Sequence, residues 1–381
     1  MQRAYQVQQL LEASADRLPG KVAVVQRERR VTYADLNERA GTIADSLVAC
    51  GVAPGDRVVV YLESSVEAVA AFFGVLKARG VVIVASPELR GERLSFVITN
   101  SGARAVITQS SRCANVLSLG SLAHTAVLVC DAATCDGRPS VVAGSHPAGG
   151  GGNLPCPGID ADLAMIIYTS GTTAHPKGVM LSHLNVLTAA SSIASYLEQD
   201  EDDIVINTLP LSFDYGLYQV LLACLVGGTV VLEPSWAYPY QVLDVMRRER
   251  VTGLPGVPST FALFLSMQGI GRSELPPLRF ITNTAAVLPV PHILALRKLF
   301  PSARLYSMYG LTECKRVSYL PPEELDRRPT SVGKGMPNVQ VRIVDGAGND
   351  VPPGAAGELV VRGSNVMLGY YNRPQETAKV I

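Results

Sequence analysis

The sequence predicts an α/β fold: two subdomains of mostly parallel sheets flanked by helices, followed by a small β-barrel-like subdomain. Three observations lead to this prediction. Short apolar runs alternate with helical patterns through roughly the first 330 residues, the order that parallel sheets require. These runs have the length of strands. After Gly333, short strand patterns joined by Gly-rich turns replace the alternation.

We therefore place one core domain over 1–381, with two α/β subdomains in approximately 1–330 and the β-rich subdomain in approximately 331–381. The first third contains helical patterns at 6–15, 32–50 and 65–78. Strand patterns lie at 22–25, 57–62, 81–85, 105–107 and 125–130. Thr32 to Leu36 opens the second of these helices, and the turn at Gly51 ends it.

The alternation is interrupted between 136 and 160. Four consecutive glycines, Gly149 to Gly152, and several prolines stand where apolar periodicity is expected, so we predict a flexible connector here. Strand patterns resume at 163–167, 204–207, 229–232, 253–257, 280–284 and 304–308. Shorter strands at 339–344 and 358–362 belong to the β-rich part.

Charge and composition exclude several classes of function. The 33 basic and 33 acidic side chains give a net charge of zero, so the chain lacks the positive field with which proteins attract nucleic acids. No apolar run reaches the length of a membrane span. The cysteines and histidines are scattered without the spacing of metal ligands. We expect a cytoplasmic enzyme with no nucleic-acid partner.

The most informative segment is 167–183, which has the sequence I-Y-T-S-G-T-T-A-H-P-K-G-V-M-L-S-H. It directly follows an apolar run with the length of a buried strand. Gly171 allows a ligand to approach the backbone, and Lys177 supplies a positive charge for phosphate. The hydroxyl donors are Ser170, Thr172 and Thr173. We interpret the segment as a phosphate-binding loop. A polar surface loop is the alternative, and the Walker-type P-loop pattern is not satisfied.

A second polar segment, S-M-Y-G-L-T-E at 307–313, follows the strand predicted at 304–308. Tyr309 offers an aromatic face for a base, and Glu313 offers a carboxylate for a divalent cation. Strand ends of this kind are frequent binding positions in α/β folds. Taken alone, the segment is explained equally well as an ordinary strand end.

Together the two segments resemble the paired motifs of the adenylate-forming superfamily, which includes acyl-CoA synthetases, peptide-synthetase adenylation domains and luciferases. The usual loop is Y-T-S-G-T-T-G-x-P-K-G-V, and this chain departs from it at Ala174. Alanine restricts the backbone there but removes no donor. The segments 31–36, 76–80 and 357–370 are similar to further superfamily elements, so the resemblance covers the whole chain.

The resemblance implies that the chain binds ATP and Mg²⁺ and activates a small carboxylic acid as an acyl-adenylate. It implies that Tyr309 lies against adenine, that Thr312 contacts the α-phosphate, and that Glu313 holds Mg²⁺. The implied catalytic residues are Lys177, Thr312 and Glu313. The implied nucleotide-binding residues are Thr169, Ser170, Gly171, Thr172, Thr173, Ser307, Met308, Tyr309 and Gly310. The complete enzyme would transfer the acyl group to CoA or to the phosphopantetheine arm of an acyl or peptidyl carrier protein.

Superfamily members continue past the position of Tyr370 into a T-G-D motif, a hinge and a small C-terminal lid domain that carries a Lys used in adenylation. This sequence ends at Ile381, before all three. We therefore expect a truncated form that corresponds to the large N-terminal domain, with the lid absent; the alternative is a natural protein that borrows its lid. Such a form should bind nucleotide and acid but adenylate poorly.

The segment L-P-L-S-F-D-Y-G-L at 209–217 lies where the superfamily lines its acid pocket. Phe213 and Asp214 resemble amino-acid-activating domains, in which the Asp pairs with the substrate ammonium, whereas the Y-G-L ending resembles acyl-CoA synthetases. The alternative is that Asp214 caps a helix starting at Tyr215. The other implied pocket residues are Gly256, Thr284, Ala285 and Ala286. We expect a mostly apolar pocket, and we expect Trp236 and Tyr238 to pack on the surface.

The sequence thus predicts an AMP-forming acid–thiol ligase. Two alternatives stay open. The first is an amino-acid adenylation domain of the peptide-synthetase type, which would use Asp214 to bind the substrate amine. The second is a non-catalytic nucleotide-binding homologue.

Overall fold

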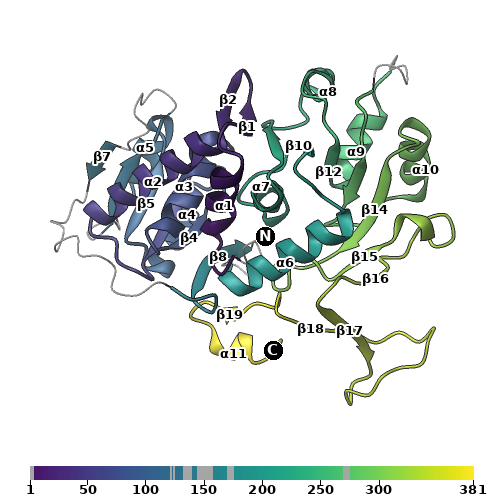
Figure 1. Cartoon of the computed structure of the whole chain (residues 1–381). Helices are drawn as coiled ribbons and strands as arrows, with labels where there is room; N and C mark the ends of the chain where they lie inside the picture. The colour runs from purple at the N-terminus through teal and green to yellow at the C-terminus, as the bar shows by residue number, and fades with distance from the viewer. Residues whose placement is uncertain are drawn as a thin grey trace.

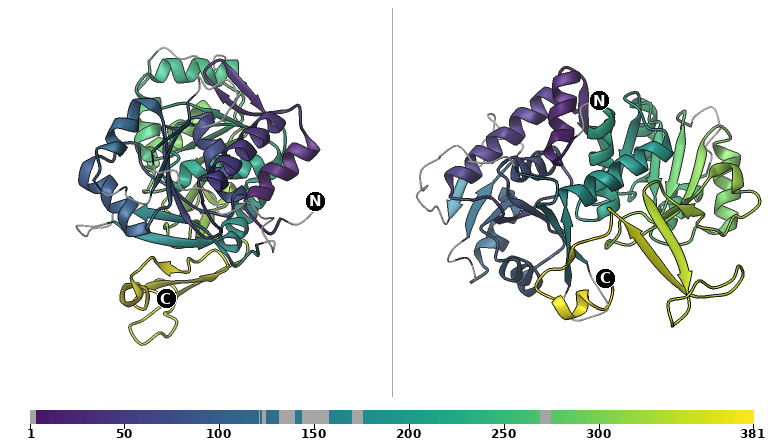
Figure 2. Two further views of the ribbon diagram at one scale, coloured as in Figure 1. Left: turned by 90° about the vertical axis from the view of Figure 1, so that its left-hand side faces the viewer. Right: turned by 60° about the horizontal axis from the view of Figure 1, so that its bottom comes forward.

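Two large sheets flanked by helices make up most of the molecule (Figure 1). The computed structural model describes residues 4–120, 122, 125–131, 140–143, 158–169, 176–268 and 275–381. The right view of Figure 2 shows the two halves side by side, with much of the yellow C-terminal segment below them. The predicted α/β class, with two largely parallel sheets, is confirmed.

The first sheet has eight strands in the order β19-β9-β8-β4-β3-β5-β6-β7. Its parallel centre consists of β3 (Arg57–Tyr61), β4 (Val81–Val84), β5 (Ala105–Thr108), β6 (Ala126–Val129) and β8 (Leu163–Thr169). Antiparallel strands border it, namely β7 (Ser140–Ala143), β9 (Lys177–Ser182) and β19 (Gly369–Tyr370). The helices of this half are α2 (Tyr33–Ala49), α3 (Val66–Lys77), α4 (Gly91–Ser101) and α5 (Ser110–Leu117).

The second sheet has nine strands in the order β16-β15-β14-β13-β12-β10-β11-β1-β2. Its parallel strands are β1 (Val22–Gln26), β10 (Ile204–Asn207), β11 (Thr229–Leu232), β12 (Gly253–Gly256), β13 (Phe280–Asn283) and β14 (Arg304–Tyr309). Its antiparallel strands are β2 (Arg29–Thr32), β15 (Ser318–Leu320) and β16 (Lys334–Gly335). The N-terminal hairpin β1–β2 therefore belongs to the sheet that the later half of the chain builds.

The remaining helices are α1 (Gln8–Arg17), α6 (His183–Leu197), α7 (Asp214–Val226), α8 (Pro239–Arg248), α9 (Pro258–Leu265), α10 (Val290–Leu299) and the short α11 (Pro374–Thr377). The β-rich part is an antiparallel pair, β17 (Val339–Val344) and β18 (Glu358–Gly363), and no closed barrel forms among the residues that the structure describes. Of the predicted connector at 136–160, residues 140–143 form β7, and most of the rest lies outside the described residues. No described helix combines the length and apolar character needed to cross a bilayer.

Local sequence explains how α2 and α3 form and pack. The Thr32 hydroxyl accepts a hydrogen bond from the Asp35 amide at 3.1 Å in a capping box, which fixes the start of α2. Ser65 caps α3 in the same way through the amide of Ala68 at 3.2 Å. The two helices approach closely at Gly74, where an added Cβ would lie 2.7 Å from a methyl carbon of Ile43.

Helix α6 begins at His183, which is buried and joins the N-terminal segment to the second half of the chain. Ser182 is the N-cap of this helix, and its hydroxyl accepts from the Asn185 amide at 3.2 Å. The Nδ1 atom of His183 accepts a hydrogen bond from the Val7 amide at 3.0 Å, so this nitrogen carries no proton. Burial lowers the pKa of His183 from 6.5 to about 4.

Trp236 lies in the core of the second sheet, so the expectation that it packs on the surface is wrong. It is 6% exposed, its Nε1 donates to the Thr208 hydroxyl at 2.8 Å, and its ring meets Phe264 edge to face at 5.8 Å. Tyr238, two residues later, is 69% exposed, as expected. The segment after β11 thus folds back over helix α9.

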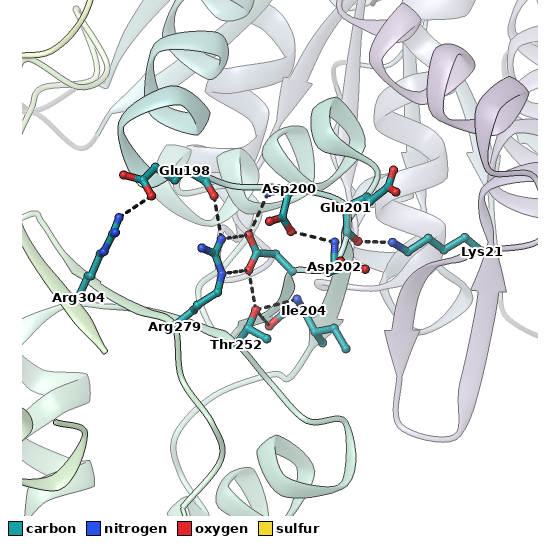
Figure 3. A network of polar contacts seen from close by, with 10 residues as sticks. Lys21, Glu198, Asp200, Glu201, Asp202, Ile204, Thr252, Arg279 and Arg304 are labelled. Atoms are coloured by element: carbon teal, nitrogen blue, oxygen red, sulfur yellow. Dashed lines mark hydrogen bonds and ion pairs between the residues drawn. The ribbon is translucent and has the colours of Figure 1, made fainter. Parts of the chain in front are cut away.

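A polar network built around the buried carboxylate of Asp203 lies at the amino-terminal edge of the second sheet (Figure 3). Asp203, with a side chain only 2% exposed, accepts two hydrogen bonds from Arg279 at 2.6 and 2.9 Å and one from the Thr252 hydroxyl at 2.8 Å. Arg279 also donates to the Glu198 carbonyl at 2.8 Å, and the Glu198 carboxylate pairs with Arg304 at 2.6 Å. These contacts join the starts of β10, β12, β13 and β14, and they leave the carboxyl ends of the same strands free to build a site.

Candidate active site

A cavity of about 300 Å³ lies at the carboxyl ends of the second sheet's strands, where the first sheet meets it through Thr169 at the end of β8. Helices α6 and α7 and the loops after β13 and β14 supply the other walls. The lining residues are Thr169, Ile193, Phe213, Asp214, Tyr215, Tyr218, Thr284, Ala285, Gly310, Leu311, Thr312, Glu313, Lys315 and Arg316. Ligands of open α/β sheets bind at this edge.

The cavity brings together eight of the residues that the sequence nominated: Thr169, Phe213, Asp214, Thr284, Ala285, Gly310, Thr312 and Glu313. The nominated loop residues Ser170, Gly171, Thr172 and Thr173 lie outside the described residues. The nominated residues that are described but do not line the cavity are Lys177, Gly256, Ala286, Ser307, Met308 and Tyr309. Residues of both segments predicted to bind nucleotide, and of the segment predicted to bind the acid, thus line one cavity.

Packing explains why some nominated residues lie behind the cavity wall. Met308 is buried, and its sulfur accepts a hydrogen bond from the Tyr196 hydroxyl at 3.0 Å. Ser307 is buried within β14, where it pairs in register with Asn283 of β13. An added Cβ on Gly256 would lie 2.7 Å from the ring of Phe261, so this glycine leaves room for a core aromatic side chain.

The predicted phosphate loop is closed by a β-hairpin, because Thr169 of β8 pairs directly with Lys177 of β9. The Lys177 ammonium lies 2.7 Å from the Glu376 carboxylate and 4.9 Å from the centre of the Tyr370 ring. Lys177 and Arg373 together lower the pKa of Glu376 to about 2. Residues close to the end of the chain therefore hold the base of the loop.

Glu313 is oriented by two contacts from the same C-terminal segment. The Tyr370 hydroxyl donates to its Oε1 at 2.7 Å, and the Met367 amide donates to its main-chain carbonyl at 2.7 Å. Burial and then this hydrogen bond raise the pKa of Tyr370 above its usual value, so Tyr370 keeps its proton as a donor.

Asp214 does not cap helix α7, so the capping interpretation is wrong. It is the first residue of the helix, Phe213 holds the N-cap position, and no side-chain cap hydrogen bond is present there. The Asp214 carboxylate is 15% exposed and lies 3.6 Å from the ammonium of Lys315. The side chain is therefore turned into the cavity.

One wall of the cavity consists of a tyrosine and a strained turn. The Tyr215 hydroxyl lies 2.6 Å from the hydroxyl of Thr282, and burial raises the pKa of Tyr215 to about 12. Ala285 has a φ of +72°, a conformation that a residue with a Cβ rarely adopts. The side-chain amide of Asn283 donates to the Ala286 carbonyl at 3.0 Å and closes this turn.

Sequence reasoning missed the two basic residues of the lining, Lys315 and Arg316. Each is 6% exposed, which is unusual for these residue types. A signal was present in the sequence, since the pair follows the T-E dipeptide closely and directly precedes Val317 and strand β15. Basic residues are otherwise expected on the surface.

Comparisons with known proteins agree with this arrangement. The family model described as AMP-binding enzyme matches residues 11–371. Zwittermicin A synthase ZmaJ of Bacillus cereus is 29% identical over 98% of this chain and 70% of its own length. Tyrocidine synthase 3 of Brevibacillus parabrevis is 31% identical over 97% of this chain, which spans only 6% of that protein.

Among solved structures, the complex of VinN with L-aspartate has a TM-score of 0.83 and 33% identity, covering 98% of this chain and 93% of that one. The inhibitor-bound N-terminal domain of FACL13 from Mycobacterium tuberculosis has a TM-score of 0.87 and 25% identity, covering 99% and 94%.

Proposed function

The chain belongs to the AMP-binding enzyme family, and from this premise we propose that it activates a small carboxylic acid with ATP. An oxygen of the substrate carboxylate attacks the α-phosphorus, the bond from that phosphorus to the β-phosphate bridging oxygen breaks, and pyrophosphate leaves. The product is an acyl-adenylate. In the full-length protein the acyl group then passes to a thiol of CoA or of carrier-protein phosphopantetheine, and AMP is released.

The observation that best supports this proposal is the combination of groups in one cavity. Thr169 and the pair Thr312–Glu313 belong to the two segments that resemble nucleotide motifs, and they share the cavity with Phe213 and Asp214 of α7. A reaction between two substrates needs both held side by side, and such positioning can supply several kcal/mol of the barrier reduction, on the order of 7–11 in favourable cases. We assign the α-phosphate contact to Thr312 and the acid wall to Phe213, Asp214 and Thr284.

The residues present fit a magnesium ion bound together with nucleotide. Mg²⁺ usually takes one or two carboxylates from the protein and the rest of its ligands from phosphates and water. Glu313 offers a carboxylate in the cavity, and the described part of the chain contains no group of three His, Cys, Asp or Glu side chains that would form a separate metal cage. When bound, Mg²⁺ would neutralise phosphate charge.

Lys177 is the proposed cation of the phosphate loop. In the structure it is paired with Glu376, so in the proposal it exchanges this carboxylate for nucleotide phosphate. Its place at the first position of β9, paired with Thr169, supports this role because the hairpin brings it to the base of the loop. A lysine that meets phosphate as a point charge is common in nucleotide sites.

A second candidate function is adenylation of an amino acid, with Asp214 as the partner of the substrate ammonium. Asp214 lines the cavity and makes no cap hydrogen bond, so helix capping does not explain an Asp at this position. The similarity to tyrocidine synthase 3 and to VinN, which was solved with L-aspartate, favours this candidate.

Pyrophosphate exchange by the full-length protein, with Mg²⁺, ATP and a panel of fatty, aryl and amino acids, tests both functions. Exchange that requires an acid supports the proposal. Lys177→Ala should reduce exchange by at least about 100-fold, whereas the exposed Lys379→Ala is the matched control and should leave it unchanged.

The same panel separates the two candidates. If amino acids alone support exchange and Asp214→Asn abolishes it, while the exposed Asp244→Asn does not, the amino-acid function holds. If no acid supports exchange although ATP binds, the non-catalytic alternative is correct and the proposal fails.

A further inference from the structure

The loop from Gly310 to Arg316 carries groups at both ends that face the same cavity. The chain turns at Lys315, which has a φ of +54°. Gly310 packs against this turn so closely that an added Cβ would lie 1.9 Å from the Lys315 carbonyl oxygen. Asn365 donates to the carbonyls of Cys314 at 2.6 Å and of Arg316 at 3.2 Å. The main chain of the loop is thus held in place by this close packing and by the side chain of Asn365.

Lys315 and Arg316 are cations with too few partners. The Lys315 ammonium is 2% exposed, its one ion pair within the described structure is with Asp214 at 3.6 Å, and at this distance it makes no hydrogen bond. The Arg316 guanidinium lies 4.8 Å from the centre of the Tyr215 ring, and its buried Nε likewise has no hydrogen-bond partner. No acidic side chain of the described part lies within ion-pair distance of Arg316.

A buried cation without an anion is expensive, by several kcal/mol per charge in real proteins. Asp214 can balance one of the two positive charges. The other acidic side chain of the lining, Glu313, is held by the Tyr370 hydroxyl and is the proposed ligand of Mg²⁺. An anion entering the cavity would supply what both cations lack.

We infer that the acid activated here carries a second carboxylate, which Arg316 binds with help from Lys315, so that the substrate class is the small dicarboxylic acids. This inference rests on the proposed function. A guanidinium forms two parallel hydrogen bonds with a carboxylate, which makes arginine well suited to this role. The cavity of about 300 Å³ restricts the substrate to a short carbon chain. Free and amino-substituted dicarboxylates share the recognised group, and Asp214 would meet an amine where one is present.

Pyrophosphate exchange by the full-length protein tests the inference with matched acids. The panel contains succinate with butyrate and aspartate with asparagine, because each pair differs mainly in the second carboxylate. We expect the dicarboxylate of at least one pair to support exchange about 100-fold better than the monocarboxylate of that pair. A loss of this size is what removing a buried charged hydrogen bond produces. Exchange with aspartate but not with succinate would indicate that Asp214 also binds an amine.

Arg316→Gln should abolish this preference and bring the two acids of a pair within about threefold of each other. The control is Arg328→Gln, since Arg328 is 67% exposed and makes only a 3.9 Å contact with Glu324. Equal or better exchange with the monocarboxylates overturns the inference. An unchanged preference for the dicarboxylate in Arg316→Gln overturns it as well. The wild-type panel decides alone if that variant fails to fold.

Calorimetry of succinate and aspartate binding to the 381-residue chain without ATP tests the dicarboxylate site separately from the proposed adenylating function. If no acid supports exchange, the proposed function fails. Binding of a dicarboxylate that disappears in Arg316→Gln would still support the anion site in that case. Absence of binding as well as exchange would overturn both.

Discussion

Arg279 holds a buried carboxylate at the edge of the second sheet, and its replacement by Gln tests how much that network contributes to stability. Asp203 is 2% exposed and receives two hydrogen bonds from Arg279 at 2.6 and 2.9 Å. Breaking a buried pair by removing one partner typically costs about 3–5 kcal/mol, because a charge is left buried and unpaired. Arg279 is 41% exposed and Asp203 keeps its bond from Thr252, so we expect the low end, about 3 kcal/mol.

Arg304→Gln is the matched control, since Arg304 pairs at 2.6 Å with Glu198 on the surface, where the two side chains are 52% and 60% exposed. Such pairs contribute about 0–1 kcal/mol. Urea unfolding followed by tryptophan fluorescence suits the comparison, because Trp236 is the single tryptophan and lies in the core of the same sheet. With an m-value of about 3 kcal/mol/M, Arg279→Gln should lower the midpoint by about 1 M. Equal shifts in the two variants would refute the reasoning.

Two further predictions concern His183 and Gly310. The pKa of His183 is about 4 in the folded state and 6.5 in the unfolded state, so between these pH values the unfolded state binds the extra proton. The free energy of unfolding should therefore fall by about 3 kcal/mol as pH drops from 7 to below 4. In denaturation at several pH values, His183→Gln should flatten this dependence and His292→Gln should retain it. Gly310→Ala should abolish pyrophosphate exchange by the full-length protein, because its Cβ would displace the Lys315 carbonyl; Gly346→Ala, which has open space, should not. Full activity in Gly310→Ala would contradict the tight packing of this loop.

The strands of both parallel sheets were predictable from the sequence because each is a short apolar run between turn residues. The strands β3, β10 and β11 begin where the pattern places them. Strands β9 and β19 were missed because their existence depends on pairing between residues far apart, such as Tyr370 with Val179. The assignment of β1 to the second sheet also follows from a distant partner, β11, which no local pattern indicates.

The site residues that belong to a recognisable motif were predictable from the sequence. Those whose place depends on which side chains become buried were not. Thr312 and Glu313 were found from their motif, and the cavity contains both. Lys315 and Arg316 were missed, because sequence alone assigns basic residues to solvent. Trp236 was misplaced for the opposite reason, since its proline-rich surroundings indicate a surface loop that in fact folds back onto Phe264.

The attachment of β19 to β9 has a mechanical consequence. Backbone hydrogen bonds join Leu368 to Met180 at 2.9 Å and Tyr371 to Gly178 at 2.7 Å, and the intervening Tyr370 donates to Glu313. This short strand therefore links two segments that are remote in sequence and that the proposed function assigns to the nucleotide site. If β19 separates from β9, the β8–β9 hairpin with Lys177 and the loop with Glu313 lose a supporting contact at the same time. The two segments to which the proposed function assigns the nucleotide therefore share one support, and Tyr370 contacts both of them.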